Sequence, residues 1–131
     1  MMKFFSSDEG ASAVEYGIMV ALIAVVIITV VALLAGVIQF GFTFFEYIQV
    51  AHAAREGVRW AALGETAQVA TRAAQAAPGL DPSLMQVNIT AGSSSDAVRV
   101  TVRYPRTELI PLPNGVMLPA LITSVAEERE E

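Results

Sequence analysis

Apolar residues are concentrated in the first third of the chain. From Tyr16 to Phe45 the sequence carries no charged side chain. A helix needs about 20 apolar residues to cross the hydrocarbon core of a bilayer, and this run is longer. The rest of the chain is too short to bury such a run as the core helix of a soluble protein. The pattern therefore predicts an apolar helix over residues 11–45 that spans a membrane or packs against other apolar helices.

The helical pattern continues past this run. No proline occurs before Pro78, and apolar residues recur at three- and four-residue spacing, which predicts an amphipathic helix ending near residue 63. Gly64 suits the end of that helix, and Thr66 suits the cap of a second helix over 66–77. The predicted buried stripe comprises Tyr47, Val50, Ala51, Ala54, Val58, Ala61 and Ala62.

After residue 84 the apolar period changes from helical to two, which predicts half-buried strands. The turn-rich segment 91–96 favours an antiparallel hairpin between two strands, and Pro105 should end the second. A third strand is expected at 121–126, after a proline-containing loop at 109–119. The alternating apolar positions of the hairpin are Met85, Val87 and Ile89 in one strand and Val98, Val100, Val102 and Tyr104 in the other.

The fold class expected from these elements is α+β. A long N-terminal apolar helix, about 11–63, should carry a small C-terminal head of one short helix and two or three antiparallel strands. The expected divisions are a leader at 1–10, the apolar helix at 11–45, the head at 46–126 and a solvated acidic tail at 127–131. The head can form a core only by packing its strands against the alanine-rich face of the helix, since two or three strands alone are marginal.

Composition excludes several function classes. The chain has 131 residues and a formal net charge of -5, which argues against non-specific nucleic-acid binding. It has no cysteine and a single histidine, so disulfides, a thiol nucleophile and a multi-histidine metal site are excluded. Without a phosphate-cradling glycine loop either, we expect no enzyme activity, no cofactor and no metal.

The first residues do not follow the order of a secretory signal. Such a signal places its cleavage site after the apolar stretch, whereas here a polar leader and a candidate junction, Gly10-Ala11, precede it. Glu15 is an unusual charge at the edge of the apolar run. It either lies at the interface in the first helical turn, where the helix dipole tolerates an acid, or pairs with a cation. Cleavage after Gly10 would create such a cation, the α-amine of Ala11.

Three other polar residues fall on one helical stripe, His52, Arg55 and Arg59. No nucleophile or second carboxylate accompanies them, so a solvated or subunit-facing stripe is favoured over a catalytic site. Glu56 and Arg59 are expected to form a weak pair. Two aromatic residues, Tyr47 and Trp60, are expected to lock the head onto the helix.

The N-terminal motif resembles a known family. Residues 10–17 read GASAVEYG, and the apolar stretch MVALIAVVII follows at 19–28. This start resembles Flp-type type IVb pilins, whose short leader ends in glycine and is followed by Glu-Tyr and an apolar helix. The resemblance covers about residues 1–30. It implies that a prepilin peptidase cuts between Gly10 and Ala11, and that Glu15 and Tyr16 serve subunit assembly.

The following segment is similar to a related family. The pattern AAREGVRWAALG at residues 53–64 resembles TadE-like minor pseudopilins of the same tight-adherence system. There are departures, because Flp major pilins are usually little more than the helix, and TadE-like proteins usually have Glu-Phe and a proline in the apolar segment. The chain has Glu-Tyr, no such proline, and a head.

Together the resemblances imply a structural pilin subunit of a Flp/Tad pilus used for surface adhesion. The precursor would lie in the inner membrane, and the processed protein would form an extracellular pilus. The implied partners are further copies of the chain, other pilins, the prepilin peptidase and the inner-membrane pilus assembly machinery. Two alternatives stay open, a TadE-like minor pseudopilin needed for assembly and a single-pass membrane protein whose head binds a partner.

Overall fold

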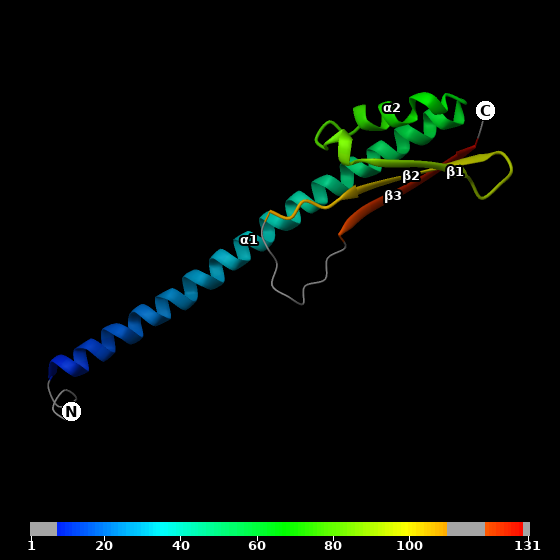
Figure 1. The fold of residues 1–131 in the computed structure, drawn as a ribbon. Coiled ribbons are helices and arrows are strands. Elements are labelled where there is room, and N and C mark those ends of the chain that lie inside the picture. The colour runs from blue at the N-terminus through cyan, green and yellow to red at the C-terminus, as the bar shows by residue number, and fades with distance from the viewer. Residues whose placement is uncertain (1–7, 110–119, 130–131) are drawn as a thin grey trace. The chain divides into compact units, whose positions relative to one another are not determined.

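The computed structural model describes residues 8–109 and 120–129. The chain divides into two compact units, Met1–Ile38 and Gln39–Glu131. The element order is one long helix, a short helical segment and a three-stranded antiparallel sheet, so the α+β prediction is confirmed (Figure 1). The loop expected at 109–119 lies outside the described residues except for Leu109.

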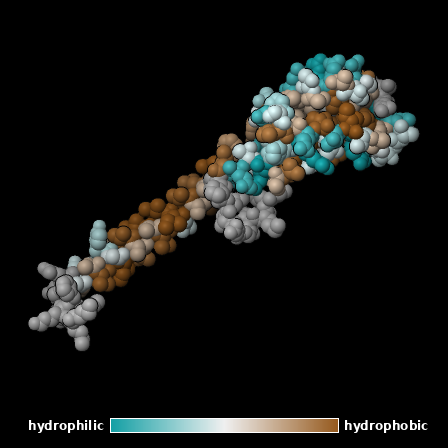
Figure 2. All heavy atoms as spheres, viewed as in Figure 1, coloured by the Kyte–Doolittle hydropathy of each residue, from teal (hydrophilic) through white to brown (hydrophobic). Residues whose placement is uncertain are grey.

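Helix α1 runs from Asp8 to Ala62, and its N-terminal part makes up the described portion of the first unit. No proline interrupts it, and apolar residues with good helix propensity fill it. Side chains from residue 11 to residue 34 are exposed on every side of this part, and Figure 2 shows them as a largely hydrophobic surface. The helix ends where expected, because Gly64 adopts a φ of 79°, the left-handed conformation that closes many helices.

Two helical segments follow, the 3-10 turn η1 (Thr66–Gln68) and helix α2 (Val69–Gln75). The predicted cap is wrong, because Thr66 lies inside η1 and no side chain caps either segment. The next 3-10 turn, η2 (Pro82–Leu84), has a true cap. Its preceding residue, Asp81, accepts hydrogen bonds from the backbone N–H and the hydroxyl of Ser83.

Three strands form one sheet in the order β1-β2-β3: β1 (Gln86–Ala91), β2 (Ala97–Pro105) and β3 (Leu121–Arg129). The hairpin prediction is confirmed, because β1 and β2 pair antiparallel. The third strand is also present, but it continues to Arg129, three residues past its expected end. Glu127 lies opposite Arg99 and pairs with it, which holds the first part of the expected tail in the sheet.

The core of the second unit lies between the sheet and the helices α1 and α2. The predicted phase of β2 is confirmed, because its alternate residues from Val98 to Tyr104 are buried. Gly57 of α1 permits the close approach, since a Cβ there would lie 3.2 Å from Cγ1 of Val100. The buried apolar residues are Val50, Ala53, Ala54, Val58, Ala61, Ala62, Val69, Ala73, Ala77, Leu80, Val98, Val100, Val102, Tyr104 and Ile122.

Some predicted core positions are exposed. Tyr47 is 53% exposed, so the prediction that it locks the head is wrong, and Ile89 of β1 is 39% exposed. Glu46 and Val50 on either side of Tyr47 are buried, so Tyr47 lies on the flank of the buried helix face, where it lines an open groove with β3. Trp60 does pack against the core, and its indole N–H donates to Oε1 of Glu56 at 2.8 Å. Glu56 is thus bonded to Trp60 rather than to the expected partner, Arg59.

Candidate functional site

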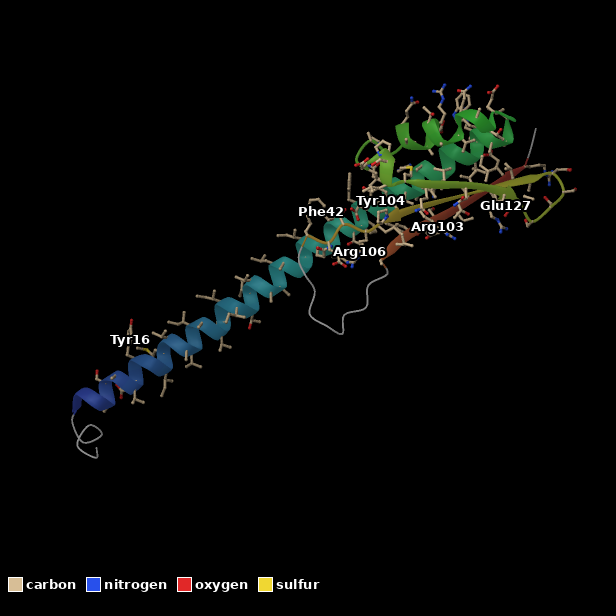
Figure 3. The ribbon with its side chains drawn as sticks, in the orientation of Figure 1. Tyr16, Phe42, Arg103, Tyr104, Arg106 and Glu127 are labelled. Atoms are coloured by element: carbon tan, nitrogen blue, oxygen red, sulfur yellow. The ribbon has the colours of Figure 1, made fainter. Side chains whose placement is uncertain are left out.

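The residues singled out for processing and assembly all lie in the first three turns of α1. Gly10 is half-buried, while Ala11, Glu15 and Tyr16 are exposed. Figure 3 shows the Tyr16 side chain projecting from the helix. The helix begins at Asp8, so the Gly10–Ala11 peptide bond lies within its first turn. Cleavage at this bond is not tested by the geometry and stays a prediction.

Glu15 is a charged group surrounded by apolar side chains. Ala11 lies one helical turn before it on the same face. Among the side chains described from residue 10 to 109 and from 120 to 129, none forms an ion pair or hydrogen bond with its carboxylate. Val14, Ile18 and Met19 beside it are exposed. The site is therefore an acidic point on an apolar helical surface.

The apolar surface itself is long. Within the described residues, α1 is the one helix that is long and apolar enough to cross a membrane. No part of its most apolar stretch is buried against the rest of the chain. At about 25 cal/mol per Å² of apolar area, packing such a surface against other apolar groups supplies tens of kcal/mol gross. Exposed apolar surface of this extent marks a membrane or protein interface.

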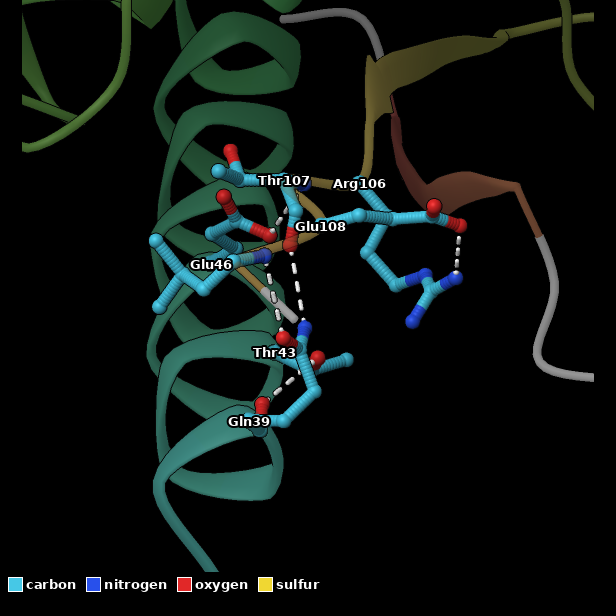
Figure 4. Close-up of polar contacts among 7 residues, drawn as sticks. Gln39, Thr43, Glu46, Arg106, Thr107 and Glu108 are labelled. Atoms are coloured by element: carbon cyan, nitrogen blue, oxygen red, sulfur yellow. Dashed lines mark hydrogen bonds and ion pairs between the residues drawn. The ribbon is translucent and has the colours of Figure 1, made fainter. Parts of the chain in front are cut away.

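A second polar site ties the chain after β2 to α1 (Figure 4). The amide of Gln39 donates to the carbonyl of Thr107 at 3.0 Å and accepts from the N–H of Leu109 at 3.0 Å. One carboxylate oxygen of Glu46, Oε2, accepts from the N–H of Thr107 at 3.2 Å. Both α1 side chains are buried. We call Gln39, Glu46, Thr107 and Leu109 together the clamp.

Sequence reasoning missed the clamp, although a signal was present. Gln39 is a strongly polar residue inside the apolar run, and Glu46 follows seven residues later. Seven residues are about two turns, so the two side chains share a face of the helix. Polar groups on one face of an otherwise apolar helix indicate that another backbone segment lies there.

Arg106 lies next to the clamp and is buried. One of its nitrogens, Nη2, pairs with Oε1 of Glu108 at 2.6 Å, and its side chain is 3% exposed. Nε and Nη1 are buried without a hydrogen-bond partner in the described part of the chain. A buried donor without a partner costs about 1–3 kcal/mol, which gives weight to the ion pair that Arg106 makes with Glu108.

At the other end of the sheet, Glu127 ties the β1–β2 turn to β3. Its Oε1 accepts from the N–H and hydroxyl of Ser93, and its Oε2 accepts from Nη2 of Arg99 at 2.8 Å. The hydrogen bonds from Ser93, followed by those from Arg99, lower the pKa of Glu127 to about 2. The Glu127 carboxylate is therefore charged in the folded protein at neutral pH.

The remaining candidates do not assemble into a chemical site. His52, Arg55 and Arg59 are exposed on α1, as expected of a solvated stripe. Among the described residues, no group of three histidine, aspartate or glutamate side chains is placed to hold a metal ion.

The guanidinium of Arg72 lies 4.3 Å from the ring centroid of Trp60 and stacks on it.

Comparison with known families adds to this geometry. Residues 4–48 match the Flp/Fap pilin component family. That match covers about a third of the chain and includes the Gly10–Ala11 junction, Glu15, Tyr16 and most of the apolar surface. The Flp/Fap pilins are a family of structural subunits and not of enzymes. No curated protein and no solved structure matches the chain.

The match supports the resemblance to Flp-type pilins found in the sequence. It also supports a membrane-anchored precursor and a pilin subunit, because the matched segment contains the apolar helix. The sheet and α2 of the second unit lie outside the matched residues, whereas Gln39 and Glu46 of the clamp lie within them. The TadE-like resemblance of residues 53–64 therefore stays a prediction.

Proposed function

We propose that this chain is a structural subunit of a Flp/Tad-type type IVb pilus that serves surface adhesion. The observation that carries the proposal is the apolar surface of α1, exposed on all sides and lying within the segment that matches the pilin family. Such a surface suits two successive environments. It spans the inner membrane in the precursor, and it packs against other copies in the filament.

Processing by a prepilin peptidase would separate a ten-residue leader from the filament subunit. The cut lies between Gly10 and Ala11, and Gly10 presents no side chain to the peptidase. Because the bond lies in the first turn of α1, the peptidase must act on an unwound first turn. Terminal turns lack part of their hydrogen bonds, so unwinding them costs little.

The new α-amine gives Glu15 a partner. In a filament, the amine of Ala11 in one subunit pairs with the Glu15 carboxylate of a neighbour. A charge pair in such a dry environment is stronger than in water. Tyr16 lies next to Glu15 on the exposed helix and contributes apolar contact area with a polar tip. Both residues thus act in subunit assembly.

The proposal is tested by microscopy and mass measurement on the same cells. Negative-stain images of cells with and without the gene should differ by thin surface filaments. The chain recovered from those filaments should lack its first ten residues. Filaments that contain the uncut chain would contradict processing, and cells that make no filament with the intact gene would contradict the pilin function.

A substitution at Glu15 tests the assembly role. Glu15→Gln keeps the shape but removes the charge, so we expect a normal, cleaved membrane precursor and a loss of most pili. The matched control is Glu65→Gln, which removes a carboxylate at an exposed position beyond α1. Pilus yield by shearing and immunoblotting measures the effect. If Glu15 lies at the helix start only as a tolerated acid, the loss is below about 1 kcal/mol and pili form normally.

The second candidate is a TadE-like minor pseudopilin needed for assembly. It is favoured by the second unit, a sheet-bearing body with its own core that lies beyond the matched segment. A minor subunit should be present in few copies per filament and should be required for filaments of another pilin. Quantitative mass spectrometry of sheared filaments separates the two roles. A single-pass partner-binding protein, the third possibility, would keep Met1 or Met2 and form no filament.

A further inference from the structure

The sheet of the second unit has two open edges. β1 and β3 each pair with β2 on one side only, and no hydrogen bond joins their outer backbone groups to another described element. β1 carries no charged residue, and neither do residues 121–126 of β3. Proteins usually guard such edges with charges, proline, bulges or a covering segment, because open edges pair with other chains. These edges are left fit for pairing.

The two edges are matched in direction. β1 and β3 are both antiparallel to β2, so they run parallel to each other. If two copies point the same way, β3 of one copy and β1 of the next form a parallel ladder. If two copies are related by a two-fold axis, the same strand pairs with itself in antiparallel fashion. The orientation of the copies thus decides which strands meet.

Apolar side chains lie beside both edges. A groove of about 550 Å³ lies between α1 and β3, and its lining combines the apolar Tyr47, Ala51 and Val58 with the charged Arg55, Glu127 and Glu128. At the opposite edge, Val87 and Ile89 of β1 lie opposite Val102 and Val100 and so share the helix-facing side of the sheet. Ile89 is nevertheless partly exposed. A β1 strand added to β3 would bring its apolar side chains to the rim of this groove, whose lining includes Tyr47, Ala51 and Val58.

We infer that β1 of one copy adds to the free edge of β3 of the next copy and extends the sheet across neighbouring heads. The occupant of the edge is a second copy of this chain. This inference rests on the proposed pilin function, because a filament holds its subunits in one orientation. The contact uses two different surfaces and does not close on itself when repeated, so it propagates along a polymer. Main-chain hydrogen bonds supply the affinity, as in strand addition to other sheets.

The absence of cysteine from the sequence allows a direct test by cross-linking. Asn88 and Thr90 of β1 and Thr123 of β3 lie on the outer side of the sheet and are exposed. The double variants Asn88→Cys/Thr123→Cys and Thr90→Cys/Thr123→Cys sample two registers of the parallel ladder. Intact pili are oxidised mildly and run on a non-reducing gel. The control is Arg59→Cys/Thr123→Cys, whose first cysteine is exposed on α1 and does not belong to β1.

A ladder of covalent oligomers from a β1/β3 double variant, with monomers from each single variant and from the control, supports the inference. Dimers from Thr123→Cys alone would indicate two-fold pairing of β3 and overturn it. Normal pili that give no ladder in either double variant would overturn the inference and leave the pilin function intact. Cells that form no pili with the unaltered chain would overturn both.

Discussion

The two units solve the burial of apolar surface in opposite ways. The second unit, Gln39–Glu131, forms a core of its own between a sheet and two helices, although several aromatic residues at its start, such as Phe40 and Phe44, stay exposed. In the first unit, the residues from 11 to 34 are exposed although nearly all are apolar. The same continuous helix takes part in both. The last part of α1 therefore supplies residues to an internal core, whereas its first part exposes an apolar surface.

The sequence of α1 changes character where this change of role occurs. Its first part is occupied by large aliphatic residues on every face, which suits lipid or other helices as the surrounding medium. Its last part carries small residues, Ala53, Ala54 and Gly57, on the face that meets the sheet. Small residues let the strands approach closely. The first part therefore has no core of its own within the described residues, whereas the second unit has one.

The largest expected effect comes from a charge placed in the internal core. Val100 is fully buried, so Val100→Asp buries an unpaired carboxylate and should cost several kcal/mol, enough to unfold the second unit. Thermal melting and limited proteolysis of the detergent-solubilised chain measure this. The control Arg103→Ala alters an exposed residue of the same strand and should stay within about 0.5 kcal/mol. A more damaging Arg103→Ala would mean that the strand phase is wrong.

Glycines of the same helix should respond differently in the two units. A Cβ at Gly57 meets Val100 at 3.2 Å and Val69 at 3.5 Å, so Gly57→Val overpacks the core and should cost about 1–3 kcal/mol. A Cβ at Gly36 meets nothing within 4 Å. Gly36→Ala should leave the melting temperature of the second unit unchanged. Equal effects of the two substitutions would show that the internal core does not depend on the close approach at Gly57.

The sequence predicted those features of the fold that depend on residues close together in the chain, and it missed those that depend on distant partners. The helix end at Gly64, the hairpin and the phase of β2 follow from residues close together in the chain, and each is confirmed. Tyr47 was misplaced because periodicity marks the centre of a buried helix face but not how far around the helix the covering segments reach. Likewise, the continuation of β3 to Arg129 depends on a partner, Arg99, that is distant in sequence.

The candidate site shows the same division. Gly10 and Glu15 stand out because their neighbours along the chain are of another type. The clamp was missed, since its acceptors and donors are backbone groups of Thr107 and Leu109, which carry no sequence signature. Arg106 was missed too, because nothing in a linear pattern distinguishes a buried arginine from an exposed one.

A smaller effect is expected at Gln39, where the second unit begins. Gln39→Leu removes two hydrogen bonds and leaves the carbonyl of Thr107 and the N–H of Leu109 without this partner. We expect the second unit to lose about 1–3 kcal/mol of stability. The control Gln75→Leu changes an exposed glutamine and should have little effect. Chemical denaturation of the solubilised chain measures both. If both variants leave the free energy of unfolding unchanged, the hydrogen bonds of Gln39 do not stabilise the second unit.

The smallest effect concerns pH and the second unit alone. Because the fold lowers the pKa of Glu127 to about 2 from an ordinary value of 4.5, its contribution to stability is fully present above pH 4.5. That contribution is lost as the pH falls from about 4.5 through 2, since the unfolded chain binds the proton first. Glu127→Gln should therefore weaken the fold at neutral pH and flatten the loss of stability on acidification. The control Glu128→Gln leaves the contacts of Glu127 with Ser93 and Arg99 in place, so the acid-induced loss should remain. Melting temperatures recorded between pH 2 and 7 decide this, and identical slopes for Glu127→Gln and the unaltered chain would show that the Glu127 contacts do not stabilise the sheet.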